Sequence, residues 1–113
     1  MTRLPAAANP LAFAHVTEKS WQGTVIAVAK THGWMVYHTH DSRKSAPGFP
    51  DILAISPTRS RLVVAELKTS IGVVSPEQDR WLKAFAEVRT SPMVYIWRPG
   101  DLEEINEVLG GQS

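Results

Sequence analysis

The chain has 113 residues, of which 43% are hydrophobic, and it contains no cysteine. This length has room for one domain with a single core, and the missing thiols exclude disulfides, zinc–thiolate sites and cysteine nucleophiles. The formal net charge is +1, but residues 1–100 carry twelve basic and seven acidic side chains, a charge of +5, and residues 101–113 carry −4. The basic body suits a polyanionic partner, although an ordinary solvated surface has a similar composition.

Residues 1–16 are expected to form a tail that precedes one domain at residues 17–113. Residues 4–13 are apolar, but Pro5 and Pro10 interrupt them. The stretch is too short for a membrane span and too weakly flanked for a signal peptide. Together with the absence of cysteine, this predicts a cytoplasmic protein without a membrane partner.

The first half of the domain is predicted to contain one helix and three strands. Thr17 is a suitable N-cap for a helix that ends near His32, before Gly33. Alternating β-formers predict three strands, at residues 34–40, 51–56 and 62–68. Because only residues 57–61 separate the last two strands, we expect them to form an antiparallel hairpin.

The second half is predicted to contain a helix, a strand and a last helix. Ser75 as N-cap and Gln78 as its partner form a capping box, with a proline in the first turn of the helix. A strand over residues 93–97 and a helix capped by Asp101 follow. The order α-β-β-β-α-β-α favours an α/β fold with a mixed central sheet flanked by helices on both sides.

Three charged residues interrupt the apolar strands of the expected hairpin. Asp51 opens one strand, and Glu66 follows four apolar residues in the other. Side chains alternate across a strand, so Glu66 and Lys68 project from the same face, and the hairpin brings Asp51 close to both. Since an unpaired carboxylate in a core strand is costly, this arrangement favours a functional site over a surface ion pair.

The chemistry of this cluster suits a hard divalent cation. Carboxylate and carbonyl oxygens are the ligands that Mg²⁺ and Mn²⁺ prefer, and the backbone carbonyl of Leu67 could add one to Asp51 and Glu66. Such an ion activates water and offsets the charge of a phosphate. Lys68 would orient the attacking water and the phosphate, or accept a proton from that water. The cluster therefore predicts phosphodiester hydrolysis.

Three motifs carry a family resemblance: Gly48-Phe49-Pro50-Asp51, Ala65-Glu66-Leu67-Lys68 and Ser75-Pro76-Glu77-Gln78. Over roughly residues 17–105 the chain resembles the VRR-NUC branch of the PD-(D/E)XK nucleases, which share a restriction-endonuclease-like core. The resemblance implies Asp51 and Glu66 as metal ligands and Lys68 as the catalytic lysine. It also implies Glu18 and Gln78 as supporting site residues, with Glu18 a further candidate ligand.

The small phage-type members of that branch are similar to dimeric enzymes that resolve DNA junctions. The resemblance therefore implies a homodimer that cleaves branched DNA such as a four-way junction, in a bacterial or phage-infected cell. Ser42, Arg43 and Lys44 are candidate DNA contacts, although a solvated loop has the same composition. A monomeric nickase, an inactive nucleic-acid-binding module of the same fold and a small regulatory domain remain alternatives.

Several of these residues also have a purely structural interpretation. Asp51 could be a turn residue after a proline, Glu18 could favour the first turn of its helix through the dipole, and Gln78 could serve only in the capping box. His38 and His40 share one face of a strand, where metal binding is possible and simple hydrogen bonding is more common.

Overall fold

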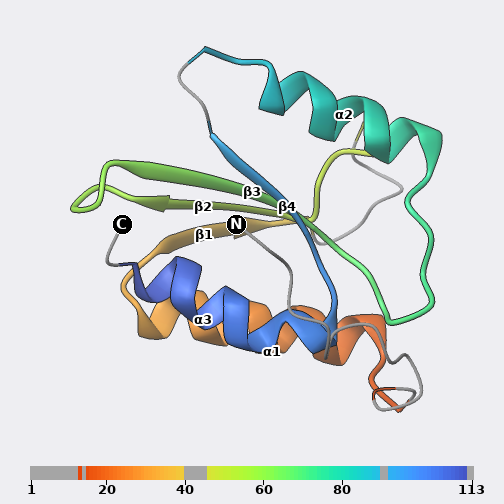
Figure 1. The fold of residues 1–113 in the computed structure, drawn as a ribbon, viewed down its shortest axis with the longest axis horizontal. Helices are drawn as coiled ribbons and strands as arrows, with labels where there is room; N and C mark the ends of the chain where they lie inside the picture. Colours follow the sequence, from red (N-terminus) through yellow and green to blue (C-terminus); the bar gives the residue numbers. More distant parts are fainter. Residues whose placement is uncertain (1–12, 14, 40–45, 90–91, 112–113) are drawn as a thin grey trace.

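A four-stranded sheet with the order β1-β2-β3-β4 forms the centre of the computed structural model (Figure 1), which describes residues 13, 15–39, 46–89 and 92–111. The elements along the chain are α1 (Glu18–Thr31), β1 (Met35–His38), β2 (Ile52–Ser56), β3 (Arg61–Leu67), α2 (Pro76–Ala86), β4 (Met93–Trp97), the 3₁₀ turn η4 (Pro99–Asp101) and α3 (Leu102–Gly110). The predicted α/β class and the order α-β-β-β-α-β-α are confirmed, in agreement with a restriction-endonuclease-like core.

The sheet is mixed. β1 pairs antiparallel with β2, and β2 pairs antiparallel with β3 in a register that places Ile52 opposite Ala65. β4 pairs parallel with β3, with Trp97 beside Leu67, because α2 carries the chain back across the sheet before β4 begins. The β2–β3 hairpin predicted from the short connection is therefore confirmed, and β3 is a central strand with a partner on each side.

The two faces of the sheet are covered unequally. In Figure 1, α1 and α3 lie below the sheet and α2 lies above it. On the lower face a continuous core joins α1 and α3 to the sheet through residues that are at most 4% exposed, among them Trp21, Val25, Trp34, Val63, Ala65, Ile105 and Leu109. On the upper face α2 packs mainly against β3 and β4, and its contacts with β1 and β2 within the described ranges are few. Met35, Tyr37 and Ile55 are consequently exposed on that face.

Local chemistry accounts for the starts of the first two helices. The hydroxyl of Thr17 accepts a hydrogen bond from the backbone N–H of Ser20 at 3.1 Å, and Ser75 and Gln78 form the predicted capping box at the start of α2. Asp101 differs from its predicted role, since its carboxylate accepts the backbone N–H of Arg98 at 2.9 Å and makes no capping bond to α3.

Two buried tryptophans attach α1 and the start of β1 to distant parts of the chain. Trp21 donates its indole N–H to the carbonyl of Trp97 at 2.9 Å, and Trp34 donates to the carbonyl of Leu109 at 2.8 Å. Both indoles are therefore buried without an unsatisfied donor. None of the helices in the described ranges combines the length and the apolar character needed to cross a bilayer.

Candidate active site

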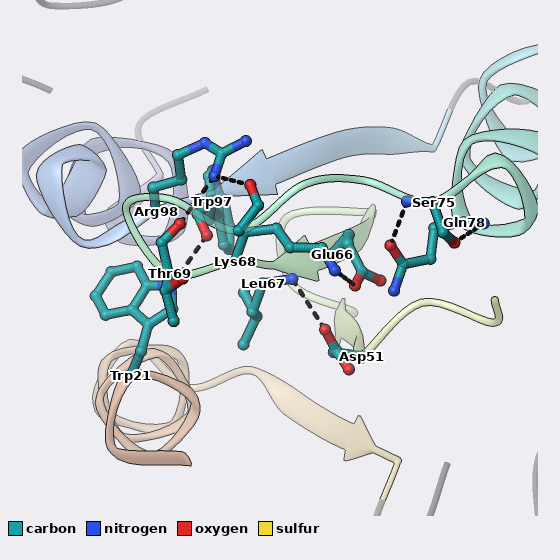
Figure 2. Close-up of polar contacts among 11 residues, drawn as sticks. Trp21, Asp51, Glu66, Leu67, Lys68, Thr69, Ser75, Gln78, Trp97 and Arg98 are labelled. Atoms are coloured by element: carbon teal, nitrogen blue, oxygen red, sulfur yellow. Dashed lines mark hydrogen bonds and ion pairs between the residues drawn. The ribbon is translucent and has the colours of Figure 1, made fainter. Parts of the chain in front are cut away.

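Asp51, Glu66 and Lys68 meet at one end of the sheet, as Figure 2 shows. Asp51 directly precedes β2, Glu66 is the last but one residue of β3, and Lys68 follows β3. Because Ile52 is paired with Ala65, Asp51 lies opposite Glu66 one step further along the hairpin. Alternation then directs all three side chains to the face of the sheet on which α2 packs, opposite the main core.

A hydrogen bond holds Asp51 and an ion pair holds Glu66 at the end of β3. Asp51 Oδ2 accepts a hydrogen bond from the backbone N–H of Leu67 at 3.0 Å. Because β2 begins only at Ile52, this N–H of β3 is paired with the Asp51 carboxylate instead of with a backbone carbonyl of β2. Lys68 Nζ lies 3.4 Å from Glu66 Oε2, and the side chains of these two residues are only 13% and 2% exposed. The three charged groups are thus held close together, and Glu66 and Lys68 are largely out of water.

The electrostatics of this cluster are unfavourable without a further cation. Burial and, next in size, the negative charge of Asp51 raise the pKa of Glu66 from 4.5 to about 8, although Lys68 acts in the opposite direction. Within the described ranges nothing donates a hydrogen bond to the buried Glu66 Oε1, and a hydrogen bond between the Glu66 and Asp51 carboxyl groups also contributes to the raised pKa. One lysine therefore does not satisfy two adjacent carboxylates.

These residues fit a hard divalent cation on chemical grounds. The donor atoms are carboxylate oxygens, and one of them, Glu66 Oε1, has no hydrogen-bond partner in the part of the chain that the structure describes. The backbone carbonyl of Leu67 is a further candidate ligand. The N–H of Leu67 faces Asp51, and the N–H and C=O of one strand residue point to the same side, so this carbonyl is directed to the same side as Asp51. Asp51, Glu66 and the Leu67 carbonyl are thus the groups that would hold the ion.

The other two predicted site residues lie in different surroundings. Gln78 is in the first turn of α2, where its Oε1 accepts the N–H of Ser75 at 2.8 Å, and in Figure 2 its amide points toward Glu66. Glu18 is exposed in the first turn of α1. No group of three His, Cys, Asp or Glu residues in the described ranges is placed to hold a metal, so the structure does not join Glu18 to the two carboxylates. Its role as a ligand stays a prediction.

The motif before Asp51 attaches the preceding loop to α2. Gly48 has a φ of +82°, and a Cβ at this position would lie 2.5 Å from the backbone carbonyl carbon of Glu77, so only glycine fits. Trp81 donates its indole N–H to the carbonyl of Pro47 at 3.0 Å, and its ring contacts Phe49 edge-on at 5.0 Å between centroids. This packing holds the segment that leads into Asp51 against α2, the helix that contains Gln78.

One residue near the site was not predicted to act there. Arg98 Nη1 donates hydrogen bonds to the carbonyls of Thr69 and Gly72, both at 2.8 Å, and so holds the loop that follows Lys68. The only sequence signal was a basic residue directly after the last strand. Nothing in the sequence pattern pairs it with that loop. His40, Ser42, Arg43 and Lys44 lie outside the described residues, so their predicted roles are untested.

A comparison with known protein families gives a match. The family model of the VRR-NUC domain matches residues 11–94 of the chain, a span that contains Asp51, Glu66, Lys68 and Gln78. Neither the curated proteins nor the solved structures gave a match. The matched span covers most of the chain and indicates a nuclease domain with a DNA substrate.

Proposed function

Because the chain belongs to the VRR-NUC family of nucleases, we propose that it is a metal-dependent DNA endonuclease that hydrolyses phosphodiester bonds with Asp51, Glu66 and Lys68. The observation that carries this proposal is the pair of adjacent carboxylates at the end of the β2–β3 hairpin, where Glu66 is buried and its Oε1 has no hydrogen-bond partner among the described residues. A purely structural pair of acids in this position would only destabilise the fold.

The chain's own residues supply positioning and charge. When bound at the carboxylates, a Mg²⁺ or Mn²⁺ ion would lower the pKa of an attacking water and offset the charge of the scissile phosphate. Lys68 is held 3.4 Å from Glu66 and is shielded from bulk water, so its ammonium group acts on a nearby phosphate oxygen with little screening. Gln78 would support the site from the first turn of α2.

Cleavage assays on the full chain test this proposal. We expect nicking of supercoiled plasmid in Mg²⁺ or Mn²⁺, binding without cleavage in Ca²⁺, and no cleavage in excess chelator. Asp51→Asn and Glu66→Gln should each abolish cleavage, whereas Asp79→Asn, which removes an exposed acid paired with Lys83 on α2, should not. Undiminished cleavage in chelator, or equal activity of all three variants, would refute the metal site.

We further propose that the substrate is branched DNA and that the enzyme acts as a homodimer. One site of this size cuts one strand, so cutting two related strands of a junction requires a second copy placed by two-fold symmetry. The β1–β2 part of the upper sheet face supports self-association, because Met35, Tyr37 and Ile55 are 65%, 60% and 46% exposed there.

The oligomeric state is tested by light scattering at micromolar concentration. We expect a dimer mass for the wild type and a monomer mass for Tyr37→Glu, which places a charge in the middle of the apolar face. Cleavage of a four-way junction and of linear duplex is compared for both proteins. A monomeric wild type that nicks the two substrates equally would refute the dimer and the junction preference, and would leave the nuclease chemistry intact.

The proposed domain begins at Thr17 and extends to residue 113. Its start is placed at Thr17 because the side chain of this residue caps α1, the first helix of the described chain. Limited proteolysis followed by mass spectrometry tests this boundary, since a resistant fragment that starts well after residue 17 would contradict it.

A further inference from the structure

The loop between β3 and α2 displays two large apolar side chains next to the active site. It spans residues 68–75, starts at Lys68, and in Figure 1 extends beyond the end of the sheet before it rises to α2. Ile71 and Val73 in this loop are 80% and 81% exposed, more than any other large hydrophobic side chain in the described ranges. Single exposed apolar residues are common, but two in one short loop beside a catalytic site indicate a binding surface.

This loop is held in place by contacts of its backbone. Arg98 Nη1 donates to the carbonyls of Thr69 and Gly72, each at 2.8 Å (Figure 2), and the N–H of Gly72 donates to the carbonyl of Thr69 at 3.2 Å. The far end of the loop is fixed by the capping box of Ser75. The two apolar side chains are therefore presented to solvent by a braced loop and contribute little to the core.

The loop also contacts the catalytic lysine. A Cβ at Gly72 would lie 3.3 Å from Cδ of Lys68 and 3.2 Å from Oγ1 of Thr69, so the backbone of Gly72 packs on the aliphatic stem of Lys68. Ile71 and Val73 flank this glycine in the sequence. The backbone that carries the two apolar side chains is therefore in contact with the lysine that we propose acts on the phosphate.

The charge of the loop fits a polyanion with exposed bases. Residues 68–75 contain no acidic side chain, and Lys68 and Arg98 lie at its base. A fully stacked duplex offers phosphates and sugars to such a loop, whereas an opened base step also offers apolar base faces. Apolar side chains inserted at such a step are a known way in which proteins bind bent or unstacked DNA.

We propose that Ile71 and Val73 form an apolar wedge that inserts at an opened base step beside the cleaved bond and so selects branched or distorted DNA. This inference rests on the proposed nuclease function and names the feature of the substrate that the loop recognises. The wedge acts by stacking against bases that the branch point has already exposed. Linear duplex offers no such bases, so the wedge contributes little to its binding.

The test uses a four-way junction with 2-aminopurine at the branch point, bound by the full chain in Ca²⁺ so that no cleavage is needed for the signal. We expect the wild type to raise the fluorescence at saturation and the double variant Ile71→Ser/Val73→Ser to lose most of this increase. Single-turnover cleavage of the junction in Mg²⁺ should fall at least about tenfold, as expected when two apolar contacts are lost, whereas nicking of linear duplex should keep its wild-type rate. Ile71→Leu, which keeps the apolar contact, should behave like the wild type.

Matched controls separate the wedge from other roles of the loop. Val88→Ser removes an apolar side chain that is 46% exposed beyond α2 and should change neither signal. Unchanged fluorescence and junction cleavage in the double variant would overturn the wedge, and so would an equal loss on junction and linear duplex. A changed mass in light scattering would also overturn it and would assign the two residues to self-association. If the wild type cut no DNA, the proposed nuclease function would fail, and the fluorescence in Ca²⁺ would still decide the wedge.

Discussion

The raised pKa of Glu66 predicts how the metal-free protein responds to pH. In the unfolded chain the carboxyl ionises near 4.5, whereas burial and Asp51 raise its pKa in the folded protein to about 8. Between these values the folded state holds a proton that the unfolded state has lost. The free energy of unfolding therefore falls as the pH rises from about 4.5 to about 8 and is level above that range.

The size of this effect follows from the two pKa values. At 1.36 kcal/mol per pKa unit, the difference corresponds to at most about 5 kcal/mol. Local relaxation of the folded protein reduces the penalty, so we expect on the order of 2 kcal/mol, equivalent to a fall of roughly 10 °C in Tm for a domain of this size. Glu66→Gln removes the charge and should remove this pH-dependent loss.

Thermal denaturation in chelator from pH 5 to pH 9 measures the difference between the two proteins. We expect Glu66→Gln to melt increasingly above the wild type as the pH rises, and Asp79→Asn to follow the wild type. Addition of Mg²⁺ at pH 8 should stabilise the wild type and have little effect on Glu66→Gln, since the bound ion offsets the two carboxylates. Parallel melting profiles for the wild type and Glu66→Gln would refute the electrostatic reasoning.

Three further predictions concern the lysine, the loop and the glycine of the first motif. Lys68→Ala should lower the single-turnover rate strongly at saturating enzyme with little change in DNA affinity, whereas Arg43→Ala should weaken binding more than turnover; an unchanged rate for Lys68→Ala would refute its catalytic role. Arg98→Ala, which removes two hydrogen bonds from a charged donor, should lower the free energy of unfolding by about 2 kcal/mol in urea denaturation, and Arg98→Lys should recover part of it. Gly48→Ala should cost more than about 2 kcal/mol because of its positive φ and its contact with α2, whereas Gly23→Ala in α1, with open space around it, should be neutral or stabilising.

Much of the fold could be predicted because its signals are local. The cap at Thr17 and the capping box of Ser75 and Gln78 each depend on residues three positions apart, and the structure confirms both. The meeting of Asp51 with Glu66 and Lys68 also follows from local rules, since a short connection forces a hairpin and alternation places side chains on faces.

Other features of the site depend on contacts between distant segments. Arg98 reaches the loop after Lys68 because β4 pairs parallel with β3 and ends beside it, and no short-range pattern specifies that pairing. The relation of Glu18 to the site also depends on tertiary contacts. The helix periodicity predicts the place of Glu18 on α1, but it does not give the distance from that end of the helix to the two carboxylates.

The sequence by itself therefore determined the elements, their order and the acidic hairpin, because periodicity, caps and turns act within a few residues of the chain. Only the tertiary structure decided that Glu66 is buried with an oxygen that has no hydrogen-bond partner among the described residues, that Met35 and Tyr37 are exposed, and that Gly72, next to the exposed Ile71, packs on Lys68. Burial and exposure depend on which surfaces α2 and β4 cover, and that choice is made by packing over the whole domain.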